Sequence, residues 1–531
     1  MRDVIEDEGR MFRPASIVSA ATGALLLITC LNLASLLLAR TFDRRAEWAT
    51  RASLGATTLD LLKQFATEAA LISGGGLAGA FFVAQSALEK LELGGLFAAR
   101  LDPRVALVLG GVGLLVTALF ALSPALWLRG QDLFSRGPQA PRTMRWRGTL
   151  VAAQVALALA LLTAAGLLIR SFDRLTSVDP GFQAANVLVS GFGLPEVRYD
   201  TDAKLAGFHE AALRNLSAIP GVLNSAGGVG VPFTGAQYRT RFDLGGVETT
   251  AEIGMASPEL FGALGIGVAA GRAFTAGDRL GAPRVALVNQ AFVRAFYPSR
   301  SPLGDRLKLS WWGPSNPRGV PWEVVGVVGD VRARSLEQAA EPRIWLPLAQ
   351  FPSEGVIYLV RTQPGVDVRE AMKQVVARVD GSLEKLRPRA LAERMATALE
   401  PRRLTLRVTS AFAFAALALC AFGLFSVSAY AARARKREFA IRAALGEPRP
   451  SLWQRLLATH LRPVLAGIAG GAVLAAWTGT LLANQLFATP WFDAGVLATV
   501  AVALALAAVA AAAWPAWQAS AVDPAQALRE S

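Results

Sequence analysis

The 531-residue sequence is poor in cysteine, in histidine and in charge. It contains two cysteines and two histidines, and only 18% of its residues are charged. Cys30 and Cys420 lie in uncharged stretches without a CxxC pair, so neither a disulfide framework nor a cysteine-rich zinc site is expected. With His209 and His460 alone, a three-histidine metal site is excluded. The polar helical pattern around His209 predicts a solvated side chain.

Motifs for catalysis and for nucleotide binding are also missing. Neither a GxSxG nucleophile elbow nor a GxxxxGK[ST] loop occurs, so this sequence does not bind ATP through a Walker A loop. The stretch GVVGD at 326–330 lacks the third glycine and the following helix of a dinucleotide-binding loop. The sequence therefore predicts a protein that is not an enzyme, without catalytic, cofactor-binding or metal-binding residues.

What the sequence has in abundance is apolar residues, 53% of the total, gathered into long uncharged blocks. Each block is long enough to cross a bilayer. The blocks are 14–39, 69–88, 105–128, 149–169, 408–432, 463–492 and 494–518. Together they exceed what the core of one soluble domain could hold, so we predict a membrane α-helical bundle of about seven transmembrane helices.

Polar residues inside these blocks are few. Since the blocks contain no Asp, Glu, Lys or Arg, the ionisable groups that an ion-coupled carrier places within its membrane spans are missing. Asn32 and Gln154 are uncharged polar residues within two of the blocks, and they are expected to form hydrogen bonds between helices. This pattern disfavours a secondary transporter.

The positive charges set the expected orientation. Lysine and arginine dominate the loops 40–63, 129–147 and 433–455, which are therefore expected on the cytoplasmic side. The inner membrane surface thus explains much of the formal net charge of +14, and nucleic acid is not an expected partner. Counting the crossings predicts that 171–403 faces the outside and that the C-terminus is cytoplasmic.

The segment 171–403 has the composition of a water-facing domain. Strand-like runs are expected at 186–190, 285–288, 322–328 and 355–361. Helices are expected at 202–218, 257–264, 289–296 and 368–379. The alternation of strands and helices predicts an α/β or α+β sandwich inserted between two membrane spans.

One short segment recurs further along the chain. EWATRASLG at 47–55 matches EFAIRAALG at 438–446, an offset of 391 residues (446 − 55). The same offset pairs Gly76 with Gly467. We therefore predict two parallel copies of a three-helix unit, 14–135 and 404–531.

Each copy of the repeated segment has the pattern of a short amphipathic cytoplasmic helix. Glu47 with Arg51, and Glu438 with Arg442, are i,i+4 pairs in the favourable order. Gly55 is expected to end its helix in a left-handed cap. Such a helix either lies flat on the membrane or docks onto a cytosolic partner, and the residues alone leave both open.

These motifs resemble the FtsX-like/MacB-like class of ABC transporter permeases, and most of all its Acidobacterial duplicated orphan members. The resemblance rests on the motifs ExAxRxxLG at 47–55 and 438–446, DPxxALR at 523–529, PGF at 180–182, GRAF at 271–274, VALVN at 285–289 and VVGVVGDV at 324–331. The resemblance covers almost the whole chain. It implies a MacB-type periplasmic core domain at 171–403 and FtsX-like permease units at 14–135 and 404–531, in the bacterial inner membrane.

The resemblance also implies how the remaining segments are organised. Residues 1–13 look like the tail of a first periplasmic domain, so the first unit is short of its own leading span. Residues 136–170 look like a cytoplasmic linker followed by the leading helix of the second unit. A cytosolic ATPase is expected to contact both copies of the repeated segment, through Glu47, Trp48, Arg51, Gly55, Glu438, Phe439, Arg442 and Gly446.

The expected function is that of a permease subunit of an ABC-type efflux or mechanotransmission system, acting on a periplasmic substrate and without its own ATPase. Its expected partners are the lipid bilayer, a separate cytosolic ABC ATPase, and periplasmic or outer-membrane proteins. No cofactor is expected. The alternative is an ATPase-independent membrane scaffold or sensor whose periplasmic domain binds envelope partners.

Overall fold

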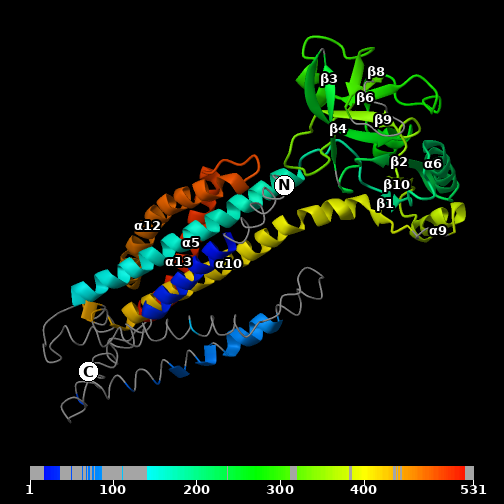
Figure 1. Ribbon diagram of the computed structural model, residues 1–531. Coiled ribbons are helices and arrows are strands. Elements are labelled where there is room, and N and C mark those ends of the chain that lie inside the picture. Colours follow the sequence, from blue (N-terminus) through cyan, green and yellow to red (C-terminus); the bar gives the residue numbers. More distant parts are fainter. Residues whose placement is uncertain are drawn as a thin grey trace. The chain divides into compact units, whose positions relative to one another are not determined.

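The computed structural model describes two compact units (Figure 1). One is Phe172–Leu404, called here the extramembrane domain, and the other combines the described parts of Met1–Ser171 and Thr405–Ser531, called here the helical unit. The described residues are 17–35 and 140–520, without 236, 245, 311–319, 382–385, 435–437, 439–440, 443–444 and 446, together with single residues and short runs between 50 and 111.

Five helices of the described residues are long and apolar enough to cross a membrane. They are Ile17–Ser35, α5 (Ala140–Thr176), α10 (Leu391–Ala434), α12 (Arg449–Leu482) and α13 (Ala494–Ser520). Five of the predicted spans correspond to these helices. The predicted span 69–88 is helical where it is described, most continuously over 78–86, and of 105–128 only residue 111 is described, so the expected number of seven remains a prediction.

Two helices of this unit begin earlier than the uncharged blocks indicated. The span expected at 463–492 belongs to α12, which already begins at Arg449, passes through Pro463 and ends at Leu482, followed by the short 3-10 helix η1 (Ala483–Gln485). The linker expected from residue 136 is helical from Ala140 onward. Proline is tolerated within a membrane helix because neighbouring helices can satisfy the freed backbone groups.

Small residues allow α5 and α12 to approach each other closely. A Cβ at Gly467 would lie 2.6 Å from the carbonyl oxygen of Ala152, and a Cβ at Gly471 would lie 2.9 Å from the Cα of Ala156. Helices in a membrane associate through such close packing, since lipid gives no hydrophobic force between them. The two glycines therefore set the contact between these helices.

A polar centre joins three helices of the helical unit. The side-chain amides of Asn32 and Gln154 both donate to the carbonyl oxygen of Leu419 in α10, over 3.1 and 2.9 Å. These bonds confirm the hydrogen bonding between helices predicted for the two residues. Beside them lies Gly423, one turn further along α10, whose missing side chain leaves room for both amides.

The loop before α13 is held to the end of α5. Arg170 forms an ion pair with Asp493, whose side chain is only 8% exposed. Asp493 Oδ1 also accepts hydrogen bonds from the backbone N–H groups of Gly495 (3.0 Å) and Val496 (3.1 Å), and so caps the first turn of α13. Ser171 Oγ accepts a further bond from the N–H of Phe487, over 2.8 Å.

The extramembrane domain is built on an 11-stranded sheet. Its strands are β1 (Val187–Gly193), β2 (Val222–Val229), β3 (Tyr238–Leu244), β4 (Val247–Ala256), β5 (Val268–Gly271), β6 (Val285–Asn289), β7 (Arg306–Leu309), β8 (Pro321–Val328), β9 (Arg343–Pro347), β10 (Gly355–Thr362) and β11 (Arg389–Ala390). Its helices are α6 (Asp202–Ser217), α7 (Leu260–Leu264), α8 (Gln290–Phe296) and α9 (Arg369–Val379), and α10 begins in it.

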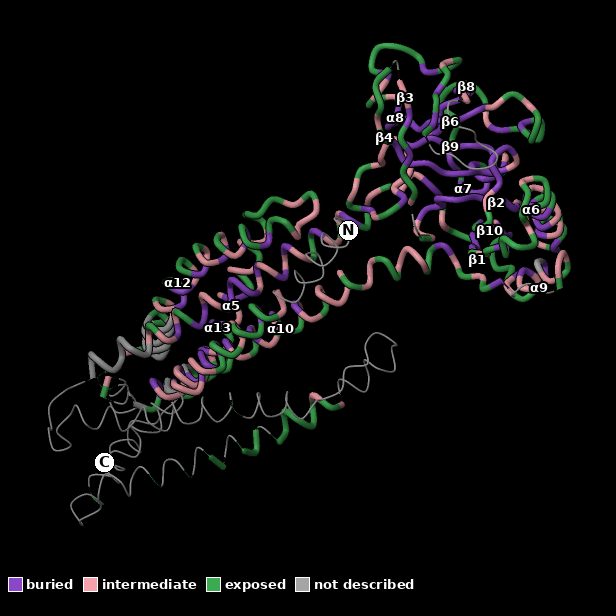
Figure 2. The backbone as a smooth tube through the Cα atoms, in the orientation of Figure 1, coloured by how far each residue is buried: buried purple, intermediate pink, exposed green. Residues whose placement is uncertain are grey.

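The sheet has an open part and a closed part. The open part runs β11-β1-β10-β2, and α6 and α9 lie side by side against it (Figure 1). The closed part runs β4-β3-β7-β8-β6-β9, and β9 pairs again with β4 to complete a ring. The two parts meet where β2 pairs with β4, and the buried residues concentrate along these strands (Figure 2).

The fold expected for this domain needs one correction. Of its strand pairings, β4–β9 and β6–β8 are parallel and the others are antiparallel. A predominantly antiparallel sheet of this kind is an α+β arrangement, with α6 on one face of β2 and β10 and α7 on the other, so the alternative named beside α/β is the better description. The α/β expectation was wrong because it left out the β3–β4 hairpin.

Candidate functional site

The residues expected to contact an ATPase are described only in part. Glu47, Trp48, Arg51, Gly55, Phe439 and Gly446 lie outside the described residues. Arg442 Nη2 donates to Glu438 Oε1 over 2.9 Å, and Arg442 Nη1 lies 3.6 Å from Glu447 Oε2. The predicted i,i+4 pair of Glu438 and Arg442 is therefore present. Its contact with an ATPase stays a prediction.

The same short segment also exposes apolar side chains. Ile441 is exposed and Leu445 is 82% exposed, and the N–H of Leu445 donates to the carbonyl oxygen of Ile441 over 3.0 Å. These two residues are four positions apart and lie on one helical stripe. An exposed apolar pair beside an ion pair is the surface of a helix that docks onto a protein or lies on a membrane.

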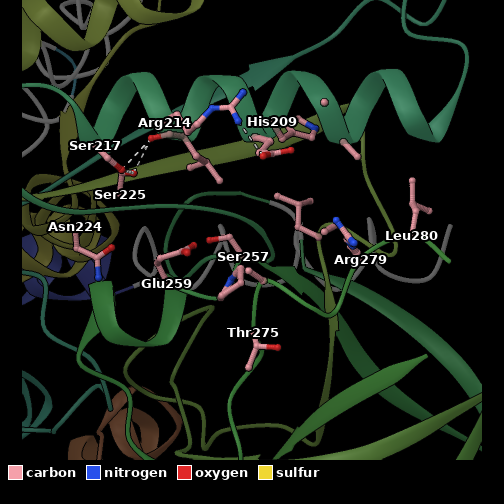
Figure 3. Close-up of a pocket in the computed structure, with 18 of the residues that line it drawn as sticks. His209, Arg214, Ser217, Asn224, Ser225, Ser257, Glu259, Thr275, Arg279 and Leu280 are labelled. Carbon is pink, nitrogen blue, oxygen red and sulfur yellow. Dashed lines mark hydrogen bonds and ion pairs between the residues drawn. The ribbon is translucent and has the colours of Figure 1, made fainter. Parts of the chain in front are cut away.

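A cleft of about 880 Å³ opens on the extramembrane domain (Figure 3). One wall is α6, from Ala203 to Ser217, and the facing wall is formed by residues 257–259 and 275–280. The beginning of β2, residues 222–225, and residues 348–349 complete the lining. No sequence pattern pointed to this cleft, because five separate stretches of chain meet to form it.

The cleft carries charges of both signs on opposite walls. On α6, Arg214 donates to Glu210 over 3.0 Å, and both side chains are largely exposed. Glu259 and Arg279 lie on the facing side, with Ser257 between them (Figure 3). A cleft of this size is typical of ligand sites, and its walls offer both donors and acceptors.

His209 lies behind the cleft wall, and the solvated state predicted for it is wrong. Its side chain is 2% exposed, with Nδ1 2.8 Å from the Tyr358 hydroxyl and Nε2 2.8 Å from the carbonyl oxygen of Ser353. Since a carbonyl only accepts, Nε2 carries the proton and Nδ1 accepts from Tyr358. Burial lowers the pKa of His209 to about 4, so the imidazole is neutral and structural.

A buried ion pair in the closed part of the sheet is likewise structural. Glu252 and Arg343 are each 4% exposed and are joined by two hydrogen bonds, while Arg334 Nε donates to the other carboxylate oxygen of Glu252 over 2.9 Å. Burial by itself raises the pKa of Glu252, but the two guanidinium groups outweigh it and hold that pKa below its ordinary value. Arg343 Nη1 also donates to the carbonyl oxygen of Gly230 over 2.8 Å, so the charges are well satisfied.

Among the described residues, no group of three or more His, Cys, Asp or Glu side chains could hold a metal ion. The candidate sites are therefore the repeated segment and the cleft.

Comparisons with protein families match most of the chain. Residues 149–378 match the model of the MacB-like periplasmic core domain. Residues 19–133 and 410–524 each match the FtsX-like permease C-terminal model. The two FtsX-like ranges reproduce the internal duplication seen in the repeated segment.

Curated relatives share about a quarter of their residues with this chain. The macrolide export ATP-binding/permease protein MacB of Nitrosomonas europaea is 28% identical over 275 residues, which cover 49% of this chain and 40% of that protein. The pyoverdine export ATP-binding/permease protein PvdT of Pseudomonas syringae pv. tomato is 26% identical over 310 residues, or 56% of this chain and 45% of that protein. The chain thus spans less than half the length of these relatives.

The solved structures that match part of this chain are isolated extramembrane domains. The periplasmic region of MacB from Actinobacillus actinomycetemcomitans is 14% identical, with a TM-score of 0.29, and covers 42% of this chain and 97% of that structure. The extracellular domain of the transporter YknZ is 17% identical, with a TM-score of 0.28, and covers 38% of this chain and 99% of that structure.

Proposed function

We propose a function for this chain on the premise that it is an FtsX-like/MacB-like ABC transporter permease. It is the transmembrane subunit of an efflux or mechanotransmission system that acts on a periplasmic substrate. In this proposal ATP is hydrolysed by a separate cytosolic ATPase; the 531 residues themselves hold no Walker A loop. The permease units would be 14–135 and 404–531, and 136–170 would supply the leading helix of the second unit.

The observation that carries this proposal is the second copy of the repeated segment, with its exposed apolar stripe. Ile441 and Leu445 are exposed on a short helical turn that the Glu438–Arg442 pair stabilises. A helix presenting this surface fits a groove of a cytosolic protein in the helix-in-groove manner. Two copies in one chain would offer one contact to each half of an ATPase dimer.

Movement at these segments would reach the extramembrane domain through α10. This helix is continuous from Leu391, which is buried in the core of that domain, to Ala434, four residues before Glu438. A hydrogen-bonded helix transmits displacement along its axis. Pro401 removes one of the backbone bonds of α10, so any bending of the helix would be concentrated there.

The protein is a multi-pass inner-membrane protein with a periplasmic domain, as its family and its apolar helices indicate. In this proposal 171–403 is that periplasmic domain and the C-terminus is cytoplasmic. The arginine-rich loops support this orientation through the positive-inside rule.

Co-purification of an ATPase from native membranes tests the proposal. We expect the full chain to retain a Walker A protein identified by mass spectrometry, and the double variant Arg51→Glu, Arg442→Glu to lose it. Arg433→Glu, in the last turn of α10 and outside the repeated segment, is the matched control and should retain it. Retention by the double variant, or no ATPase with the wild-type chain, would contradict the proposal.

The scaffold or sensor function is the second candidate, since the cleft offers the kind of binding site on the extramembrane domain that this function needs. Under that function the chain would bind an envelope partner and no ATPase would co-purify. The same experiment therefore separates the two functions.

A further inference from the structure

The cleft lies where β2 loses its neighbouring strand. On one side β2 pairs with β10 from Val222 to Gly228. On the other side β2 pairs with β4 only at Gly228 and Val229, opposite Ala256 and Met255. The first half of β2 therefore has one edge without a described strand beside it.

The hydrogen-bond alternation shows which backbone groups face that edge. Gly227 turns both of its groups away from β10, since its N–H donates to Ser257 Oγ over 3.2 Å and its carbonyl accepts from the N–H of Ser257 over 2.8 Å. Because bonding alternates along an antiparallel strand, Ser225, two residues earlier, turns its N–H and C=O to the same edge. No described strand pairs with these two groups.

The edge is open because the chain turns away at Ser257. Pro258 has no N–H with which to extend the β4 ladder, and the chain then passes into α7. The position that a continued β4 would occupy beside Ser225 is part of the cleft, which Ser257, Pro258 and Glu259 line. Ser225 is only 3% exposed, and nearly buried backbone groups of this kind are almost always paired.

The dimensions of the cleft suit an extended chain. Its lining follows α6 from Ala203 to Ser217, which at 1.5 Å per residue is a length of roughly 20 Å. An extended chain rises about 3.3 Å per residue, so about six residues fit along this wall. Leu213 and Leu280 offer apolar contacts, and the acids and arginines of the two walls offer partners for charges of either sign.

We propose that this cleft binds an extended polypeptide segment of a periplasmic protein, which pairs with the open edge of β2 at Ser225 and carries side chains of both charges. A polypeptide is the occupant that supplies an N–H and a C=O at the spacing of a strand. Binding of this kind goes beyond the proposed transport function and does not depend on an ATPase.

The test uses the full chain in nanodiscs and a library of fluorescein-labelled decapeptides in which apolar and charged residues alternate, with lysine and glutamate equally represented. Binding is measured by fluorescence anisotropy. We expect saturable binding that N-methylation of alternate peptide amides weakens at least tenfold, because it removes the donors needed for edge pairing. Equal binding of the N-methylated library, or no saturable binding at all, would overturn the proposal.

Two tryptophan variants of α6 locate the binding. Gly207 lines the cleft, and a Cβ there would meet no atom within 4 Å, so the side chain of Gly207→Trp starts without a clash on the cleft wall. It should weaken binding at least tenfold. Lys204→Trp, on an exposed position of the same helix outside the lining, is the matched control and should stay within twofold of wild type. Equal effects of the two variants would place the peptide elsewhere and refute the assignment.

Discussion

The backbone of Gly423 lies against the side-chain amide of Gln154, so closely that a Cβ at residue 423 would come within 2.6 Å of Gln154 Nε2. The same Cβ would lie 2.8 Å from Asn32 Oδ1. Gln154 and Asn32 both donate to Leu419, one turn earlier on α10. The absence of a side chain at Gly423 is therefore what lets three helices share one polar centre.

Replacing Gly423 by alanine should destabilise the helical unit. The added methyl must displace two amides that are fixed by their bonds to Leu419, and overpacking of this kind costs about 1–3 kcal/mol. We expect Gly423→Ala to lower the melting temperature of the detergent-solubilised chain, measured by tryptophan fluorescence. Gly470→Ala is the control, because a Cβ at Gly470 meets nothing within 4 Å. Equal melting temperatures for the two variants would show that the centre can relax.

Removing one partner of the buried Glu252–Arg343 pair should lower the free energy of unfolding more than removing both. Arg343→Met leaves the Glu252 carboxylate nearly buried with only Arg334 beside it, and breaking a buried pair in this way costs about 3–5 kcal/mol. The double variant Arg343→Met, Glu252→Leu should recover part of this loss in a urea unfolding titration. A double variant less stable than the single one would refute this order.

The same pair should make stability depend on pH in acid. The folded-state pKa of Glu252 is held below its ordinary value near 4.5, so its contribution is present above that pH and is lost as the pH falls through the folded-state pKa. Arg343→Met should reduce this acid dependence. Unfolding free energies of the two chains measured between pH 3 and 6 would be compared, and unchanged slopes would contradict the assignment.

His209 should add a second pH dependence of stability, at higher pH than that of Glu252. Its pKa is lowered from 6.5 to about 4 by burial, so between these values the unfolded chain takes up a proton that the folded protein does not. Stability should therefore decrease by about 3 kcal/mol as the pH falls through this window. In His209→Gln this part of the slope should vanish, which denaturant titrations at pH 7 and pH 5 would detect.

At the loop before α13, Asp493 should contribute more to the stability of the protein than Arg170. Asp493→Ala removes the ion pair and also the two backbone bonds that cap α13, and loss of a cap costs about 1 kcal/mol. Arg170 is 44% exposed, so Arg170→Ala should cost less than about 1 kcal/mol. Thermal melts of the two variants would be compared, and a larger effect of Arg170→Ala would invert the expected order.

Segments with a strong local pattern were predictable from the sequence. The apolar runs that became β6, β8 and β10 were placed within a residue or two, and α6 was recognised between Asp202 and the Pro–Gly turn at 220–221. The membrane helices followed from the absence of charge over long stretches. In these segments burial and local propensity favour the same structure.

β2 could not be predicted in the same way. Its sequence, VLNSAGGV, is rich in residues that are rare in strands, and pairing with β10 imposes its conformation. Gly228 is required there by packing, since a Cβ would lie 2.8 Å from the carbonyl oxygen of Met255. The cleft could therefore not be predicted from the sequence either, because β2 forms one of its sides.

Other features were missed although a signal existed. The Gly–Gly dipeptide at 245–246, flanked by alternating residues, is a hairpin pattern that marks β3 and β4. His209 lies four residues after Leu205 and three before Ala212, on the buried stripe of α6. Its position on that stripe, more than its polar neighbours, indicated burial.

The boundaries of the extramembrane domain fall inside α5 and α10, not in loops. Exchange of this domain between related genes would therefore have to preserve helical phase at both junctions. A helix turns about 100° per residue, so one added or lost codon would rotate everything beyond it by more than a quarter turn. Recombination at these junctions should thus leave insertions of about seven or eleven residues, which nearly restore the phase, and few of other lengths.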